Sequence, residues 1–571
     1  MKTRVPSLIL AIAGIVSALG VVMMFLGTRA VGVTWDEKAH ASFLEEYFTS
    51  GWNIGGGWLE HGELAPFLGK WPYFVYAPVS SWFAHAIGVI TGTESTPGLI
   101  STADAYATRH IASAILALLG IAAVALTVQL ITRSWRWAVL GTAVICAVPM
   151  WIGHGMFNIK DTPVGTGYAL ATLGIVALVR VDYGQTIRLR LIAYGGIVLG
   201  LVIAVGTRPA SGVPVALTIM GILAAGVGYA FFTRKQAQRT FSRLRIRLID
   251  LIAAPIIAYV CLLLIYPNAF ANPYRLIHET VAISGRFPVN DPQLTNGVWQ
   301  TQPVPWTYLP TWFIAQLPLL VLVFSLIFCG YWLVAVLRTL RRRSTTTELE
   351  GWVLAVPVIA QVTLLPTIAI LGHATMYNST RQFIFVAPAA AILATLGIRS
   401  LVNSLAKQGT WISVGRYAIW VLVAVGLLAP TVDQLRLYPY NYVYFNELAT
   451  LKPINGNWAT DYWRASSQEL TRIIPPVGPT SCIYIDEKHP ARPCDVDTSF
   501  EPFWNQRGAD AQPGVLNDHE YWLVRENGGP IQMPPGCTLQ GEITRPLRGE
   551  QVIIGQVAKC MLPAGLSATA S

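Results

Sequence analysis

Long apolar stretches alternate with short polar connections along most of this chain. A membrane-crossing helix needs about 20 predominantly apolar residues. After residue 432 the pattern changes to short β-like runs separated by turns rich in Pro and Gly. Eleven stretches approach the length of a membrane span: 7–30, 106–131, 137–152, 163–180, 190–206, 210–232, 249–267, 307–337, 352–371, 382–402 and 415–431. The pattern predicts a polytopic α-helical membrane domain over 1–432 with about eleven transmembrane helices, followed by a small mixed α/β or β-rich domain over 433–571.

Basic residues collect at every second connection between these stretches. Cytoplasmic connections of membrane proteins carry an excess of Lys and Arg, so the N-terminus is predicted to be cytoplasmic and the C-terminal domain extracytoplasmic. The basic clusters lie at 2–4, 133–136, 180–190, 234–247, 338–343 and 407–416. The connections that then face outside are 31–105, 153–162, 207–209, 268–306 and 372–381. We therefore expect a multi-pass protein of the plasma membrane.

One further apolar stretch, 73–92, does not fit this alternation. Counting it as a span would place the basic cluster at 133–136 outside the cell. Its proline and its amphipathic aromatic residues suit a helix at the level of the lipid headgroups. We therefore predict an interfacial or re-entrant helix within the outer loop 31–105.

The composition agrees with a membrane protein. Of 571 residues, 53% are hydrophobic and only 12% are charged, with a mean hydropathy of +0.49, whereas soluble domains carry about 25% charged residues. The net charge of +10 resides in short clusters between apolar stretches, which is a topology signal rather than a nucleic-acid surface. The chain contains no nucleotide-binding fingerprint, which argues against a nucleotide-driven pump.

Four of the seven cysteines fall in the C-terminal domain: Cys482, Cys494, Cys537 and Cys560. An even number in an extracytoplasmic domain predicts two disulfides. Three connectivities are possible.

The stretch 34–48, TWDEKAHASFLEEYF, places Asp36 and Glu37 at the mouth of a membrane span. Acids so close to hydrocarbon are costly, which makes them candidates for a functional site. The alternative is a solvated helix start in which Thr34 caps the helix and the acids lie on its wet side.

The other outer connections also carry charges next to spans. Lys160 and Asp161 precede one span, and Arg208 lies between two spans. His373 and Arg381 lie near the two ends of the connection 372–381, at the membrane boundary. Structural alternatives exist for each: Asp161 can cap a helix while Lys160 snorkels, Arg208 can lie among headgroups, and His373 can make an ordinary polar contact.

A metal site is a weaker hypothesis. Asp36 and His40 lie at positions i and i+4, so one helical face could present both to a divalent ion. No cluster of His, Cys and Asp has the spacing of a zinc site. We expect no cofactor, and we regard His40 and His373 as possible accessory residues.

Together the outer connections bring acids and cations to one membrane face. One carboxylate could deprotonate an acceptor hydroxyl while cations hold a phosphate through charge-assisted bonds. This combination of a carboxylate and several cations suits the transfer of a sugar from a lipid phosphate, because the leaving group is already a stable anion that cations can neutralise. Nucleotide sugars are normally unavailable outside the cytoplasm, so a polyprenyl-phosphate donor fits this face.

The chain also resembles bacterial relatives of the protein O-mannosyltransferases, which belong with the aminoarabinose transferases to the GT-C glycosyltransferase superfamily. The ordered series of motifs covers most of the chain. The motifs are the Asp36-Glu37 pair, NIKDTP at 158–163, PWTYLPTWF at 305–313, YNSTRQFIF at 377–385, YPYNYVYFNEL at 438–448 and TDYW at 460–463.

This resemblance implies roles for individual residues. Asp36 matches the proposed catalytic base, Asp161 matches the acid of the second outer connection, and Arg381 matches a candidate phosphate ligand. Gln382 stands where relatives often have a histidine, so no role of that histidine carries over. Arg208 and Lys160 are assigned to the donor phosphate on physical grounds, and Glu37 is assigned beside Asp36 as an acceptor-orienting residue. The family implies an inverting transfer without an essential metal.

We therefore predict a hexosyl- or pentosyltransferase, resembling a mannosyltransferase, that moves a sugar from a polyprenyl-phosphate donor to a hydroxyl of a protein, glycan or lipid. Membrane lipids are expected partners, and nucleic acid is not. Two alternatives use the same charges. A flippase could pass a polyprenyl-linked sugar across the membrane, and a non-catalytic envelope assembly subunit would need the acids only as helix caps.

Overall fold

The computed structural model of the chain describes residues 4–34, 36–53, 59–60, 63–64, 76–95, 100, 102–180, 187–213, 216, 237–285, 292–341, 346–405, 412–474, 483–484, 503, 520–525, 533 and 535–561. The predicted span at 210–232 falls largely outside these ranges, as do Cys482 and Cys494.

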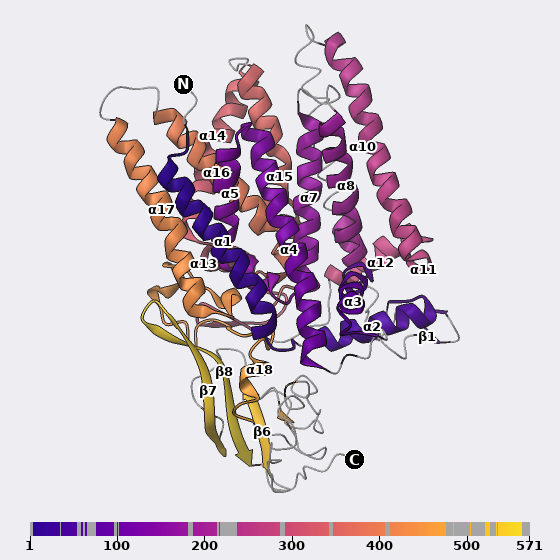
Figure 1. Cartoon of the computed structure of the whole chain (residues 1–571), viewed down its shortest axis with the longest axis vertical. Coiled ribbons are helices and arrows are strands. Elements are labelled where there is room, and N and C mark those ends of the chain that lie inside the picture. Colours follow the sequence, from indigo (N-terminus) through magenta and orange to yellow (C-terminus); the bar gives the residue numbers. More distant parts are fainter. Residues whose placement is uncertain are drawn as a thin grey trace.

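Within the described ranges, eight helices are long and apolar enough to cross a membrane. They stand side by side as the upright helices of Figure 1. These helices are α1 (Ser7–Ala30), α4 (Ala103–Thr132), α7 (Asp161–Val179), α8 (Ile187–Thr207), α14 (Leu319–Leu340), α15 (Thr346–Leu371), α16 (Val386–Leu405) and α17 (Ile412–Leu437). The predicted polytopic α-helical architecture is confirmed.

Two predicted spans differ from a single helix, and a proline lies at each break. The stretch 137–152 forms α5 (Trp135–Cys146) and α6 (Pro149–Gly155), bent by 72° relative to each other. The stretch 307–337 forms α13 (Tyr308–Gln316) and then α14, which starts after Pro318. Proline has no backbone N–H and is favoured at the first turn of a helix, so it starts a new helix rather than continuing the old one.

Another predicted span, 249–267, is the apolar end of α10 (Ala237–Ile265), which continues into the short helices α11 (Pro267–Phe270) and α12 (Pro273–Gly285). The outer loop 268–306 also holds a small hairpin of β3 (Gln293–Thr295) and β4 (Val298–Gln300).

Helix α7 lies deep in the bundle, where its span is 94% buried. Small residues let it approach α8 closely. A Cβ added to Gly167 would lie 2.6 Å from the carbonyl oxygen of Gly200, and one added to Gly174 would lie 2.6 Å from the backbone nitrogen of Ile197. Glycines permit such backbone contact between membrane helices. The first residue of α7, Asp161, is therefore held on a rigid element.

Two helices of the first loop lie across the upright bundle rather than along it. Helix α2 (Glu37–Ser50) runs across its lower end in Figure 1, and α3 (Val79–Thr91) is seen nearly end-on there. Helix α3 has 13 residues, fewer than a span requires. Between them lies a short hairpin of β1 (Leu59–Glu60) and β2 (Glu63–Leu64). The position of α3 at the lipid headgroups stays a prediction.

The C-terminal region forms a four-stranded sheet in the order β5-β6-β8-β7. Strand β5 (Ile483–Tyr484) pairs parallel to β6 (Glu520–Arg525), while β8 (Glu550–Met561) pairs antiparallel to both β6 and β7 (Cys537–Leu547). The predicted small β-rich region is confirmed. A disulfide joins Cys537 and Cys560, which leaves one of the three predicted connectivities.

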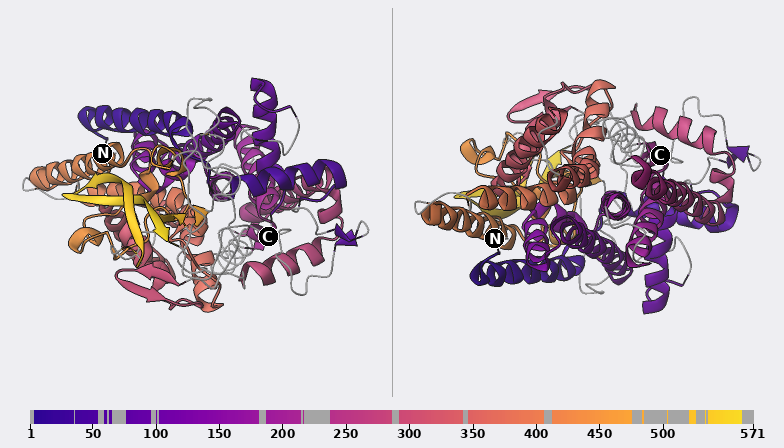
Figure 2. Two further views of the ribbon diagram at one scale, coloured as in Figure 1. Left: turned by 90° about the horizontal axis from the view of Figure 1, so that it is seen from below. Right: turned by 90° about the horizontal axis from the view of Figure 1, so that it is seen from above.

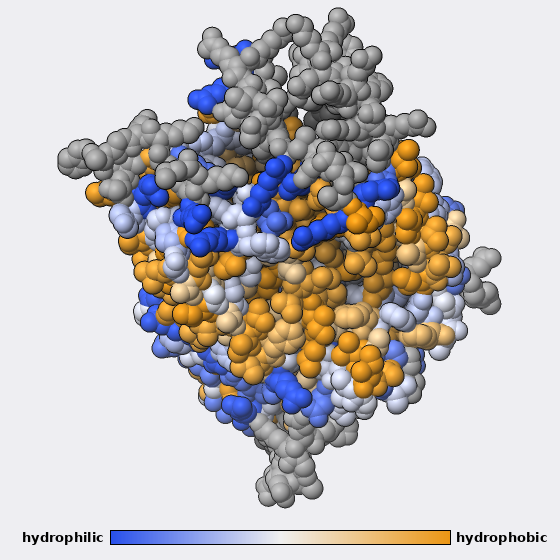
Figure 3. All heavy atoms as spheres, turned by 45° about the horizontal axis from the view of Figure 1, so that its top comes forward, coloured by the Kyte–Doolittle hydropathy of each residue, from blue (hydrophilic) through white to orange (hydrophobic). Residues whose placement is uncertain are grey.

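The sheet lies below the helices in Figure 1, and Figure 2 shows from below that it sits beneath the side of the bundle that contains α17. Figure 3 shows a broad apolar belt between more hydrophilic rims, as expected of a surface that faces lipid. The end of the bundle that carries the sheet is called the sheet end below. Its assignment to the extracytoplasmic side stays a prediction.

The segment 438–474 connects α17 to the sheet and folds between the two. Its short helices are η5 (Asn441–Val443), η6 (Ala449–Leu451) and α18 (Ser467–Leu470). The Glu550 carboxylate accepts hydrogen bonds from the backbone nitrogens of Ile454 and Asn455 at 2.7 and 2.9 Å, and Thr460 Oγ1 donates to the carbonyl oxygen of Ile553 at 2.8 Å. The β7–β8 hairpin thus supports this segment directly.

Candidate functional site

Five charged residues from four connections meet at the sheet end of the bundle. Lys160 Nζ lies 2.5 Å from Asp36 Oδ2, and Arg381 Nη1 lies 3.7 Å from the same oxygen. Arg208 Nη2 lies 2.7 Å from Asp161 Oδ1. We call Asp36, Lys160, Asp161, Arg208 and Arg381 the charged cluster. We expected these residues to converge at one membrane face, and in the structure they lie together.

Each member is positioned by the end of a helix. Asp36 precedes α2 and Lys160 precedes α7, whose first residue is Asp161. Arg208 follows α8, and Arg381 opens the short helix η4 (Arg381–Phe383). Neither Asp36 nor Lys160 makes a side-chain capping bond to its helix, so both side chains are available to the cluster.

The cluster is buried on one side and open on the other. Lys160, Asp161 and Arg381 are 3%, 2% and 5% exposed, whereas the side chains of Asp36 and Arg208 are 36% and 23% exposed. Lys160 therefore does not snorkel toward water. Asp36 is the carboxylate that an incoming molecule can reach.

The cluster has an excess of positive charge. Three cations and two carboxylates give a formal charge of +1. The Nε atoms of Arg208 and Arg381 are buried and have no hydrogen-bond partner in the described part of the chain. Buried donors of this kind are normally paired, so the site is suited to an anion with several acceptor oxygens.

Aromatic rings separate the cations. Arg381 lies 4.2 Å from the ring centroid of Trp463 and 4.8 Å from that of Tyr377, while Lys160 lies 5.2 Å from the Trp463 ring and 5.0 Å from the Tyr76 ring. Attraction between a cation and an aromatic face stabilises a desolvated charge without neutralising it. The three rings therefore help to hold like charges close together.

Asn158 sets the geometry of the turn before α7. Its Oδ1 accepts from the backbone nitrogens of Lys160 and Asp161 at 3.1 and 2.7 Å, and its Nδ2 donates to Asp161 Oδ2 at 3.1 Å. Asparagine commonly closes such turns onto the backbone two or three residues ahead. This bond pattern explains how the sequence NIKD presents Lys160 and Asp161 to one site.

The ionisation of Asp36 and His40 follows from their surroundings. Burial disfavours the charged carboxylate of Asp36, but Lys160 and Arg381 outweigh that effect and hold its pKa well below the usual range. Burial, assisted by Lys160, lowers the pKa of His40 to about 3. Asp36 is thus a carboxylate and His40 is neutral at physiological pH.

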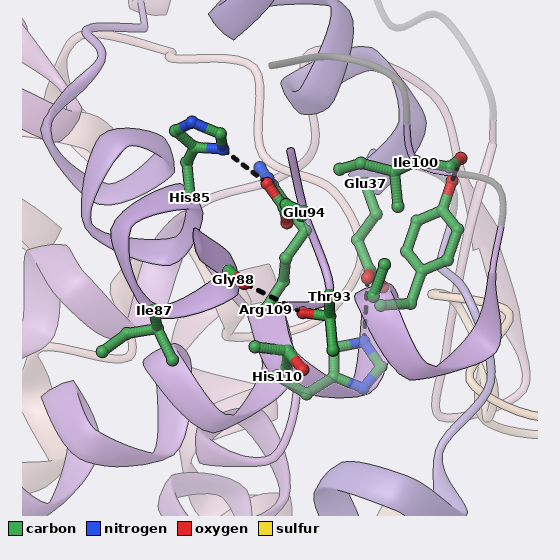
Figure 4. Close-up of polar contacts among 12 residues, drawn as sticks. Glu37, His85, Ile87, Gly88, Thr93, Glu94, Ile100, Arg109 and His110 are labelled. Carbon is green, nitrogen blue, oxygen red and sulfur yellow. Dashed lines mark hydrogen bonds and ion pairs between the residues drawn. The ribbon is translucent and has the colours of Figure 1, made fainter. Parts of the chain in front are cut away.

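Glu37 is not part of the charged cluster. Its Oε1 accepts from the backbone nitrogen and the hydroxyl of Thr34 at 2.8 and 2.6 Å, and its Oε2 lies 2.8 Å from His110 Nε2 (Figure 4). This contact has the spacing of half a capping box, in which a glutamate reaches back to the backbone N–H three residues earlier. Glu37 thus joins Thr34 to the start of α2, but it is 3% exposed rather than on a solvated face, and Asp36 rather than Thr34 directly precedes the helix.

Neither accessory histidine forms an ion pair with the charged cluster in the described part of the chain, although His40 lies close enough to Asp36 and Lys160 for their charges to affect it. His40 is buried and packs edge-on against Phe43 and Tyr76. His373 is exposed and follows the end of α15. Among the residues that the structure describes, no group of three or more His, Cys, Asp or Glu side chains could hold a metal ion.

A second buried polar group ties the first loop to α4. Glu94 accepts from Arg109 Nη1 at 3.2 Å and lies 2.7 Å from His85 Nδ1 (Figure 4). His85 belongs to α3, and Arg109 and His110 belong to α4. Neighbouring residues of α4 thus hold α3 through Glu94 and α2 through Glu37.

Sequence reasoning assigned no role to Trp463, Tyr377, Tyr76 or Asn158. Asn158, Tyr377 and Trp463 each lie in one of the motifs, and Tyr76 is one of the aromatic residues of the predicted interfacial stretch. These motifs marked the segments, but nothing in the sequence showed that the Trp463 ring lies against Arg381 and Lys160.

No family model matches the chain, and no curated protein matches it significantly. Among solved structures, it is similar to the oligosaccharyltransferase AglB from Archaeoglobus fulgidus in complex with an inhibitory peptide and a dolichol-phosphate, at 14% identity and a TM-score of 0.45 over 75% of this chain. The chain spans 55% of that protein.

Two further structures are similar. One is ArnT from Cupriavidus metallidurans bound to undecaprenyl phosphate, with 13% identity, 98% coverage of both chains and a TM-score of 0.44. The other is the protein O-mannosyltransferase Pmt1-Pmt2 complex of S. cerevisiae bound to the sugar donor, with 13% identity, 52% and 39% coverage, and a TM-score of 0.33. At this distance they do not define the chemistry of this chain.

Proposed function

We propose that this protein is an inverting glycosyltransferase that moves a sugar from a polyprenyl-phosphate donor to an acceptor hydroxyl at the extracytoplasmic face of the plasma membrane. The observation that carries the proposal is the charged cluster: a reachable carboxylate, Asp36, within 4 Å of two buried cations, Lys160 and Arg381. The cations suit the phosphate and the carboxylate suits the hydroxyl.

The charge of the cluster supports a phosphodiester donor. A polyprenyl-phosphate sugar carries one negative charge, which matches the formal charge of +1 at the site. Transfer adds a second negative charge to the phosphate and a proton to Asp36, so that the cluster then has a charge of +2. The site and its ligand are therefore neutral together before and after the reaction, and such neutrality favours charges that are removed from water.

In the proposed step, the acceptor oxygen attacks the anomeric carbon from the side opposite the phosphate. Its proton passes to an oxygen of Asp36, and the bond between the anomeric carbon and the phosphate oxygen breaks with its electron pair on that oxygen. Lys160 and Arg381 neutralise the developing phosphate charge. No general acid is needed, because the leaving group is a stable anion.

Asp161 and Arg208 have a supporting role in this proposal. Asp161 is 2% exposed and is held by Asn158 and Arg208, so it lacks the access that a base requires. It keeps Arg208 oriented, and Arg208 in turn offers a further donor to the phosphate through its unpartnered Nε.

The donor reaches the site from the membrane. The charged cluster lies at the ends of α7 and α8, both of which are long enough to cross the bilayer. A polyprenyl tail can therefore lie among the helices while its phosphate enters the cluster. We propose a hexosyl or pentosyl donor of the mannose type, an acceptor hydroxyl on a protein, glycan or lipid, and no metal ion.

The proposal is tested with purified protein in lipid nanodiscs. The protein is incubated with a panel of polyprenyl-phosphate sugars and with peptide, glycan and lipid acceptors, and the products are identified by mass spectrometry. We expect one donor to be consumed, the transferred sugar to have the inverted anomeric configuration, and transfer to persist in EDTA. Consumption of no donor would refute the proposal, and loss of transfer in EDTA would favour a metal held by Asp36 and His40.

A further inference from the structure

Asp36 contacts the same two cations that are proposed to bind the donor phosphate. Its Oδ2 lies 2.5 Å from Lys160 Nζ and 3.7 Å from Arg381 Nη1. A general base works best when its pKa is near the working pH. A carboxylate held by two cations is a weak base, so the arrangement seen here is poorly suited to removing a proton from a hydroxyl.

The groups around Asp36 leave few other ways to activate it. Lys160 approaches from the turn before α7 and Arg381 from η4. His40 approaches from α2 and is neutral. The Tyr76 hydroxyl accepts a hydrogen bond from Lys160 Nζ at 3.4 Å. Only a change in the partners of Lys160 and Arg381 can therefore make Asp36 much more basic.

The two carboxylates of the cluster differ in how firmly they are held. Asp161 is buried and is bound by Asn158 through both its side chain and its backbone. Asp36 makes no capping bond to its own helix, and its side chain is 36% exposed. Asp36 can thus give up its cations at little cost to the fold, whereas Asp161 cannot.

We propose that the donor phosphate takes Lys160 and Arg381 from Asp36, so that Asp36 becomes a competent base only after the donor has bound. The inference rests on the proposed function. Each cation exchanges one oxygen partner for another and keeps its charge. The freed carboxylate stays beside the anomeric carbon, where it takes the proton of the acceptor hydroxyl as described above. The enzyme therefore binds the donor first and the acceptor second.

The first test needs no variant. The pH profile of kcat/KM for the donor reports ionisations of the free enzyme, and that of kcat reports those of the complex. We expect the acidic limb of kcat to lie about one pH unit or more above the acidic limb of kcat/KM. Limbs that coincide would overturn the proposal.

The second test measures donor affinity directly. The probe is farnesyl methyl phosphate, a phosphodiester with one negative charge and no sugar to transfer, and binding is followed by calorimetry. Asp36→Asn leaves Lys160 and Arg381 without a carboxylate to release, so we expect the Kd at pH 7 to fall about fivefold or more.

The matched control is Asp161→Asn, which removes the same charge from the same cluster. Its direct ion pair is with Arg208, and it acts on Lys160 and Arg381 only at longer range, so we expect a clearly smaller gain in affinity than in Asp36→Asn. Equal tightening in both variants would show that only net charge matters and would overturn the proposal, as would unchanged or weaker binding by Asp36→Asn.

The outcomes separate this inference from the proposed function. If the wild-type protein transfers sugar, but the two pH limbs coincide and Asp36→Asn does not bind the phosphodiester more tightly, the proposed function stands and the exchange of cations from Asp36 to the donor phosphate is refuted. A wild-type protein that neither binds the phosphodiester nor transfers sugar refutes both. Size-exclusion profiles check that each variant is folded.

Discussion

Lys160 Nζ and Asp36 Oδ2 lie 2.5 Å apart, although 124 positions separate the two residues in the chain. The lysine is almost completely buried, whereas the aspartate side chain is 36% exposed. The pair therefore connects the protected interior of the site to the surface that substrates can reach. Each of these two charged residues, taken alone, could be an ordinary feature of a helix end. Their contact shows that they belong to one site.

Replacement of Asp36 by Asn should abolish transfer without unfolding the protein. A positioned general base contributes a factor of about 10² to 10⁴, so we expect kcat to fall at least a hundredfold in single-turnover assays. Glu45→Gln is the matched control, because Glu45 is an exposed acid on the same helix. A fully active Asp36→Asn protein would remove Asp36 from the mechanism.

Replacement of Arg381 by Ala should mainly weaken donor binding. The guanidinium can bind a phosphate through two parallel charge-assisted bonds, so we expect the Kd for the donor to rise about tenfold or more. Arg381→Lys should recover only part of the loss. Arg275→Ala serves as the control, since that side chain is 51% exposed and pairs with Glu279. Unchanged donor affinity in Arg381→Ala would contradict the assignment.

Trp463 should contribute to donor binding although it carries no charge. Its ring lies against both Arg381 and Lys160, and a desolvated cation–π contact contributes about 0.5–2 kcal/mol. We expect Trp463→Leu to raise the Kd several-fold and Trp463→Phe to retain most of the affinity. If Trp463→Phe and Trp463→Leu behave alike, the ring does not act through the cations.

Glu37 should act through Asp36 rather than on the substrate. Glu37→Gln replaces the buried partner of His110 and Thr34, which should cost about 1–3 kcal/mol of stability and lower Tm. Because Asp36 precedes the helix that Glu37 stabilises, kcat should fall, but less than in Asp36→Asn. An unchanged Tm together with a loss of activity equal to that of Asp36→Asn would instead indicate a direct role in catalysis.

Acid should destabilise the protein through His40. The pKa of His40 is lowered to about 3 in the folded state, while an unfolded histidine titrates near 6.5. The unfolded state therefore binds more protons between these values, and stability falls as the pH falls below 6.5. The loss is about 3 kcal/mol by pH 4.5 for an isolated group. Tm in detergent should decrease over this range, and His40→Phe should decrease less.

Hydropathy and charge along the chain were sufficient to predict the polytopic helical domain and the C-terminal sheet. They were sufficient because backbone polar groups in a bilayer must be satisfied within each helix, so a span is a local feature of the sequence. The same reasoning identified Asp36, Asp161, Lys160, Arg208 and Arg381, because charges beside spans are conspicuous in a sequence with few charged residues. Pro149 and Pro318 were visible too, yet the breaks at these prolines were not predicted, since helices in membranes tolerate proline when neighbours satisfy the freed groups.

Tertiary structure alone decided which of these charges are partners. The sequence placed Glu37 beside Asp36, but in the structure Glu37 contacts His110 of α4, whereas Asp36 contacts Lys160 and Arg381. Trp463 reaches the cluster on the segment 438–474, which the β7–β8 hairpin supports. Hydropathy patterns along the chain indicate which segments lie in the lipid bilayer and which lie outside it. The pairing of charges depends on the packing of helix ends that are distant in sequence, and no local pattern encodes that packing.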